Sequence, residues 1–198
     1  RERIGQAGFL AALSGFRSPL AAILWIEAHS AWENTEWGRM AGLFDTVTTL
    51  QPRSLTYWDM AAWHMAWNAS TAAIQNEKQP SEALRIKAQR EYFNLSRDFL
   101  ERGIKNNPDR YQLYLQLAVL LRDKFEDHCA AAEAFAKAAA DLSTKAVKVK
   151  ILHEGTGTMT ETDILLASAS DAIIIGFNVR ASVKVKELAV KENVDVRS

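Results

Sequence analysis

CAAAEAFAKAAADLST, residues 129–144, decides the fold because two different patterns of apolar residues meet there. Alanine is the strongest helix former, so the stretch predicts a helix over about 130–142. Its apolar residues are spaced by four, three and four, which places them on one helix face: Ala131, Phe135, Ala138 and Leu142. The sequence on either side determines what this helix packs against.

The chain before this stretch has the apolar periodicity of consecutive helices. Between Leu20 and Leu142 apolar residues recur at intervals of three and four, and the prolines lie between the periodic stretches. The pattern repeats at about 34 residues, the period of tetratricopeptide repeats, which fold as pairs of antiparallel helices. Small residues recur where paired helices would approach most closely: Ala28, Ala62 and Ala118. Residues 20–140 thus resemble a bacterial tetratricopeptide-repeat protein, with an insertion at about 68–90 after which Ser81 is predicted to cap a helix.

The chain after the stretch has the pattern of a small α/β fold. Val147–Ile151 alternates apolar residues with lysines, Ala172–Phe177 is a continuous apolar run, and Val194-Asp195-Val196 places two valines around one aspartate. Each predicts a strand. Helices are predicted between the strands, and the first begins with a capping box from Thr160 to Asp163. The order strand, helix, strand, helix, strand predicts a three-stranded parallel sheet with right-handed crossovers.

Several consecutive motifs resemble the third domain of bacterial translation initiation factor two: Asp141–Thr144, Val147–Val149, His153–Gly157, Thr160–Asp163 and Gly176–Arg180. The resemblance covers about residues 142–198. It implies a sheet with one strand and one helix ahead of Leu142, but the opening strand has no counterpart in this sequence. The GTPase domain of that factor would carry the motif G-x-x-x-x-G-K-[ST], which does not occur here.

The two resemblances together predict an α plus α/β architecture. Antiparallel helical hairpins of the tetratricopeptide kind continue through a shared helix into a small three-stranded parallel α/β lobe. Residues 1–142 are expected to form the helical repeat domain and residues 130–198 the partial factor domain, with the helix 130–142 belonging to both. An alanine-rich amphipathic helix can serve both domains without a flexible linker. Such an in-register junction favours an engineered chimera.

Composition bears on partners and location. The 24 Lys and Arg balance the 24 Asp and Glu, so no net field attracts nucleic acid or a membrane, and we expect neither as a partner. The apolar runs near the N-terminus are separated by Arg17-Ser18-Pro19, and each is shorter than the roughly 20 residues that cross a bilayer. The single cysteine, Cys129, is expected to pack as a small apolar residue. A soluble, cytoplasmic protein is therefore expected.

No group of residues has the pattern of a catalytic, cofactor or metal site, so we expect no enzymatic activity and no bound cofactor. The turn at residues 155–157, Gly-Thr-Gly, lacks the third glycine and the acidic ribose ligand of a dinucleotide loop, which favours a structural turn without nucleotide. His29 and His64 lack a second ligand at a metal-binding spacing. Basic residues near the C-terminus alternate with glutamates, which favours a solvated helix face over contact with ribosomal RNA: Arg180, Lys184, Lys186 and Lys191.

All six tryptophans lie between Trp25 and Trp67. Trp63 and Trp67 are four residues apart on one helix face, where they would either line a groove for a partner peptide or pack between helices. The lobe without its opening strand would present a sheet edge through which the chain self-associates. Two functions follow: a non-enzymatic chimeric structural protein, or a natural adaptor that binds a peptide or the translation machinery.

Overall fold

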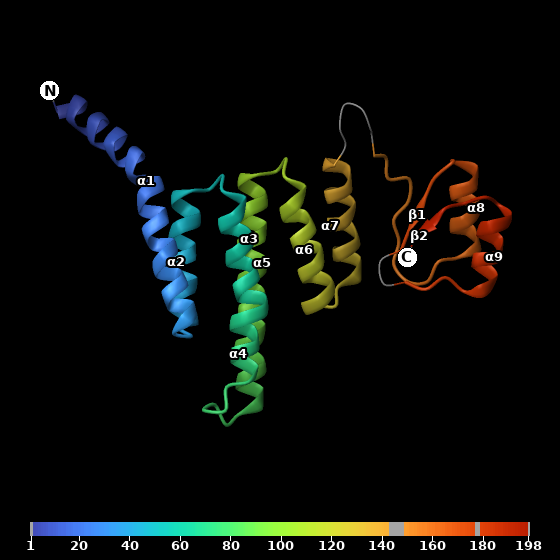
Figure 1. Ribbon diagram of the computed structural model, residues 1–198, viewed down its shortest axis with the longest axis horizontal. Helices are drawn as coiled ribbons and strands as arrows, with labels where there is room; N and C mark the ends of the chain where they lie inside the picture. The colour runs from blue at the N-terminus through green and yellow to red at the C-terminus, as the bar shows by residue number, and fades with distance from the viewer. Residues whose placement is uncertain (1, 143–148, 177–178, 198) are drawn as a thin grey trace. The chain divides into compact units, whose positions relative to one another are not determined.

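The structure is a computed structural model that describes residues 2–142, 149–176 and 179–197, with side chains from residue 15 onward. The chain divides into two compact units, residues 1–154 and residues 155–198. The first unit is helical and the second combines helices with a small sheet (Figure 1).

The first unit is a row of consecutive helices (Figure 1). They are α1 (Glu2–Glu33), α2 (Trp37–Leu50), α3 (Leu55–Trp63), the π-helix η1 (His64–Ala69), α4 (Ser70–Ile74), α5 (Glu82–Asn106), α6 (Tyr111–Lys124) and α7 (His128–Asp141). Neighbours in sequence pack as pairs: α1 with α2, the continuous rod α3–η1–α4 with α5, and α6 with α7. Helical hairpins are therefore present, while their assignment to the tetratricopeptide family stays a prediction.

Prolines separate most of the helices, as the sequence predicts. Pro52, Pro80 and Pro108 lie in loops, and Ser81 caps α5 by accepting a hydrogen bond from the backbone N–H of Leu84 at 3.4 Å. Pro19 is the exception because it lies inside α1. The two apolar runs that it separates in the sequence thus form one helix.

The main core of the first unit lies between α1, α2, the α3–η1 rod and α5. Its largest fully buried side chains include Phe99, Met40 and Met65. The alanines predicted at the close approaches are all buried: Ala28, Ala62 and Ala118. Ser96 of α5 donates its hydroxyl to the carbonyl of Ala62 at 2.8 Å, so a buried polar contact also joins α5 to α3.

Helix α7 packs on α6 through a second, smaller core of short side chains: Ala118, Leu121, Ala131 and Ala134. Its bounds, His128–Asp141, agree closely with the predicted 130–142, and Asp127 caps it by accepting from the N–H of Ala130 at 3.0 Å. Cys129 is exposed, so the expectation that it packs as an apolar residue is wrong. It lies in the first turn of α7, outside the buried stripe. That this helix also belongs to a second domain stays a prediction.

The second unit contains α8 (Glu161–Ala169), β1 (Ile174–Ile175), α9 (Val183–Lys191) and β2 (Val196–Arg197). The two strands are parallel, with Ile174 opposite Val196. The predicted capping box is confirmed: Thr160 accepts from the N–H of Asp163 and the Asp163 carboxylate accepts from the N–H of Thr160. The core joins both helices to the sheet through Ile164, Val185 and Ala189.

The sheet is smaller than the predicted three strands. In the described residues it has two strands, and Val149 and Ile151 lie in a segment without regular secondary structure, while Val147 lies outside the described residues. Alternating apolar residues favour a strand, but a strand forms only when a neighbouring backbone accepts and donates its hydrogen bonds. The described chain is therefore mostly helical, with one small parallel sheet.

Candidate functional site

The candidate site lies around the π-helix η1, which interrupts the rod between α3 and α4. A single π-turn inside an α-helix leaves backbone groups partly unsatisfied and is frequent at functional sites. Here side-chain hydroxyls donate to carbonyls within the turn, Ser70 to Ala66 and Thr71 to Trp67, both at 2.6 Å. The sequence gives no signal for a π-helix, so this feature was not predicted.

His64, the first residue of η1, is the most enclosed titratable group of the site. It is 8% exposed, and its Nδ1 atom lies 2.9 Å from the side-chain amide nitrogen of Asn68, within hydrogen-bond distance. Burial lowers the pKa of His64, and the neighbouring His29 lowers it further. The buried ring is thus held in its neutral form.

Aromatic rings from three helices surround this histidine. Their centroids lie 5.0 Å (Trp63), 5.7 Å (Phe44) and 5.8 Å (Trp32) from that of His64. We call His29, Trp32, Phe44, Trp63 and His64 the His64 cluster. His29 joins it through Trp32, with ring centroids 5.3 Å apart, and its Nε2 atom lies 3.6 Å from a carboxylate oxygen of Glu33.

The two predicted groove residues have different neighbours. Trp63 ends α3, is 43% exposed and contacts the His64 ring. Trp67, within η1, is half-buried against the main core, and the Nζ atom of Lys124 lies 5.1 Å from its ring centroid. Lys124 also lies 5.6 Å from the ring of Phe93, which makes Trp67 part of the packing between η1, α5 and α6. A single peptide groove lined by both tryptophans stays a prediction.

The second unit offers a shallow surface hollow of mixed charge. Its lining is Glu161, Lys184, Glu187, Leu188 and Lys191. The Nζ atom of Lys184 lies 2.7 Å from a carboxylate oxygen of Glu161, and the hydrogen bond between them raises the pKa of Lys184. Gly157 has φ +102°, a conformation that favours glycine in a turn. Lys184, neutralised by Glu161, offers little field to a phosphate backbone.

Two other kinds of feature, metal-binding clusters and membrane-crossing helices, are absent from the described part of the chain. No group of three or more His, Cys, Asp or Glu residues there could hold a metal ion. None of the helices described is long and apolar enough to cross a membrane.

Comparison with known proteins assigns the C-terminal third of the sequence. The family described as Translation-initiation factor 2 matches residues 125–198. Translation initiation factor IF-2 of Desulfotalea psychrophila is 83% identical over 66 residues, and that of Nitratidesulfovibrio vulgaris is 63% identical over 65 residues. Each alignment covers 33% of this chain, but only 7% and 6% of the respective relatives.

No solved structure matches the chain. The family match includes α7 and the whole second unit, and it does not extend to residues 1–124. The chain spans only a small part of the length of the curated relatives that it matches. Its C-terminal third, residues 125–198, therefore contains a segment of a translation initiation factor IF-2 domain.

Proposed function

We propose that the chain is a non-enzymatic, chimeric structural protein in which a tetratricopeptide-like helical array and part of an IF-2 domain share helix α7. One observation carries the proposal: the family match begins at residue 125, ahead of α7, whereas the buried side chains of α7 pack on α6, which lies outside the match. Helix α7 therefore matches the IF-2 family by sequence but packs within the helical unit. This is the property expected of a helix that two domains share.

The interface between α6 and α7 explains how such a junction is tolerated. Ala131 and Ala134 of α7 meet Ala118 of α6, and short side chains let two helices approach without a specific fit of large groups. Asp127 caps α7 from the loop that follows α6, which fixes the start of the helix within the array. The junction thus requires only an amphipathic helix with a small-residue face.

The finer parts of the fold belong to the same proposal. The paired helices and the buried Ala28, Ala62 and Ala118 support a tetratricopeptide-like array. The alternation around Val149 supports a third strand that forms when a neighbouring backbone is supplied. The IF-2 segment supports a cytoplasmic origin for that part of the sequence.

The test of this function is co-sedimentation of the purified full chain with bacterial ribosomes through a sucrose cushion, together with calorimetric titration of GTP and ATP. We expect the chain to stay in the supernatant and both titrations to give no binding heat. Stoichiometric pelleting with ribosomes would overturn the proposal in favour of an adaptor for the translation machinery. Saturable heat with a nucleotide would overturn its non-enzymatic part.

A second candidate is a natural adaptor that binds a peptide, and the exposure of Trp63 favours it. A tryptophan that is 43% exposed beside a cluster of rings provides apolar area at little cost in side-chain entropy. Selection of a displayed peptide library on the full chain tests this function. An adaptor requires peptides whose binding is lost in Trp63→Ala and kept in Trp63→Phe, whereas peptides insensitive to both substitutions count against it.

A further inference from the structure

We infer that the exposed rings of the His64 cluster, flanked by the carboxylates of Glu33 and Asp59, bind a basic peptide through its arginine side chains. The inference rests on the adaptor function, the second candidate above, and names the chemistry of the peptide. Its basis is the order of groups on α1 and α3, where aromatic rings form a row with one carboxylate at each end.

The rings of the row come from both helices and contact one another in turn. His29 lies 5.3 Å from Trp32 between ring centroids, and Trp32 lies 5.8 Å from His64. The row ends at Trp63, 5.0 Å from His64. The His64 ring is buried, whereas both tryptophans are exposed. Two indoles joined by a covered imidazole thus reach the surface, and the face of an indole attracts a cation.

A carboxylate lies at each end of this row. At one end, Glu33 is exposed and its carboxylate oxygen lies 3.6 Å from Nε2 of His29. At the other end, Asp59 precedes Trp63 by four residues within α3, so their side chains are neighbours on one helix face. Asp59 is half-buried, and burial raises the pKa of its carboxyl group. A carboxylate that has lost part of its hydration is stabilised by a cationic partner.

Arginines neutralise the other acidic side chains of this region. From residue 15 to residue 74 the structure describes five acidic side chains, and three of them contact arginines. Glu27 and Glu36 contact Arg39, and Asp45 contacts Arg102. Among the described residues, the two acids with no lysine or arginine at ion-pair distance are those that flank the row. Charge complementarity therefore selects a basic partner and disfavours an acidic one.

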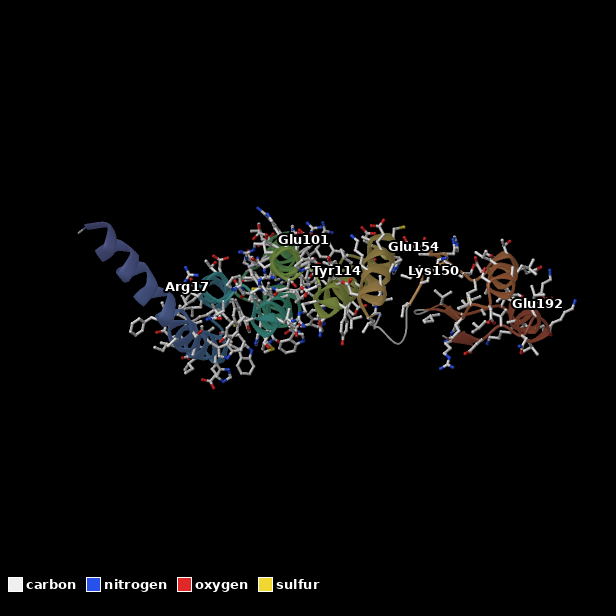
Figure 2. The ribbon with its side chains drawn as sticks, turned by 90° about the horizontal axis from the view of Figure 1, so that it is seen from above. Arg17, Glu101, Tyr114, Lys150, Glu154 and Glu192 are labelled. Carbon is white, nitrogen blue, oxygen red and sulfur yellow. The ribbon has the colours of Figure 1, made fainter. Side chains whose placement is uncertain are left out.

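The other cations of the region are placed elsewhere. Arg17, labelled in Figure 2, lies in the same helix as Glu33 but sixteen residues before it, about 24 Å along the helix axis. Arg53 donates from its guanidinium to the carbonyl of Asn106 at the end of α5. The sequence has no lysine before Lys78. The cation that complements the row is therefore expected from another chain.

Arginine is the side chain that fits both kinds of group. Its planar guanidinium stacks on an aromatic ring and donates two parallel hydrogen bonds to a carboxylate, whereas the ammonium of lysine is a strongly hydrated point charge. The ring of Trp63 and the carboxylate of Asp59 offer both on one helix. A second basic residue of the same peptide can pair with Glu33, and two linked contacts bind more tightly than one.

Fluorescence anisotropy of labelled peptides with the purified full chain tests the inference. The probes are three decapeptides in which glycine alternates with arginine, glutamine or glutamate. We expect saturable binding of the arginine peptide that weakens with added salt, and no binding of the other two. Asp59→Asn and Glu33→Gln should each raise its Kd by about two- to fivefold, the effect of losing a partly exposed ion pair. Trp63→Ala should raise it by about tenfold, and Trp63→Phe by less.

Glu101→Gln is the matched control, because Glu101, labelled in Figure 2, is an exposed acid of α5 outside the row. It should leave the Kd unchanged, and circular dichroism checks that each variant is folded. An arginine peptide that does not bind, or that loses as much affinity with Glu101→Gln as with Asp59→Asn, would overturn the inference.

The displayed library separates this inference from the adaptor function. Selected peptides that need Trp63 but carry no basic residue would overturn the inference and leave the adaptor function standing. A selection that yields no peptide dependent on Trp63 would overturn both.

Discussion

Gly103 of α5 and Trp58 of α3 pack so closely that a Cβ atom at residue 103 would lie 2.9 Å from the Cγ atom of Trp58. The same atom would lie 3.1 Å from Cδ1 of Leu113 in α6. Three helices therefore converge at a position where only hydrogen fits. The two nearest neighbours, Cγ and Cβ, are the inner atoms of a buried tryptophan and have little room to move, and the third is a terminal methyl carbon of the buried Leu113.

Gly103→Ala should consequently destabilise the helical unit although alanine is the better helix former. Overpacking of this kind costs about 1–3 kcal/mol. Gly42→Ala in α2 is the matched control, because nothing lies within 4 Å of the added Cβ. There the helix preference alone should raise stability by about 0.5–1 kcal/mol. Urea unfolding followed by tryptophan fluorescence measures both, and equal effects of the two substitutions would contradict the close packing.

Asn107 joins two loops and should be sensitive to truncation. Its buried side-chain amide donates to the carbonyls of Pro52 at 2.9 Å and Gly103 at 3.0 Å, and Trp58 donates to the same Pro52 carbonyl at 2.9 Å. Asn107→Ala should lower the free energy of unfolding by about 1–3 kcal/mol, because it removes two buried hydrogen bonds. The control is Asn106→Ala, which removes one hydrogen bond to the carbonyl of Arg102 in the same helix. Thermal unfolding of the two variants compares their losses of stability.

Acid should weaken the helical unit through His64. Burial and His29 lower its pKa in the folded chain, so the unfolded chain takes up a proton at a higher pH than the folded one. The contribution of His64 to the free energy of unfolding is therefore fully present above the unfolded pKa of about 6.5. It is lost as the pH drops from there towards the lowered folded pKa. His64→Gln, which keeps a polar partner for Asn68, should flatten the stability profile in that window. His128→Gln, at an exposed histidine, should leave it unchanged.

The two groove tryptophans should differ in their effect on stability. Trp67→Ala removes a ring that packs against the main core and under Lys124, and should cost at least about 2 kcal/mol. Trp63→Ala removes an exposed ring and should cost clearly less. Chemical denaturation of both variants measures the difference. A larger loss for Trp63 would mean that its ring serves packing, which would remove the basis of the adaptor hypothesis.

Features set by local chemistry could be predicted from the sequence, and features set by distant partners could not. Ser81 and Thr160 cap helices because a hydroxyl reaches a backbone N–H three residues on, which the order of residues alone defines. The strand around Val149 is different. Its alternation is clear, but pairing depends on backbone elsewhere in the chain, and the described part of the segment has no strand.

The candidate site was only partly predictable for the same reason. Trp63 and Trp67 stand out by type and spacing, yet their neighbours come from helices that the spacing does not reveal: α1 and α2 for the His64 cluster, α5 and α6 for Trp67. The exposure of four apolar residues of α1 was also missed: Phe16, Leu20, Ile23 and Ile26. These residues fit a helical pattern equally well whether they face a core or solvent, and Pro19 obscured the continuity of the helix.

Ala138→Pro tests whether α7 serves both parts of the chain. Ala138 is buried within α7, and proline there removes a helix hydrogen bond and clashes with the preceding turn, at a cost of about 3 kcal/mol or more. Tryptophan fluorescence follows the helical unit alone, because every tryptophan lies before residue 68. Amide hydrogen exchange in α8 and α9 follows the other unit. Shared use of α7 requires that protection falls in both, whereas Lys137→Ala, at an exposed position of the same helix, should change neither. Full protection of α8 and α9 in the proline variant would mean that α7 belongs to the helical array alone.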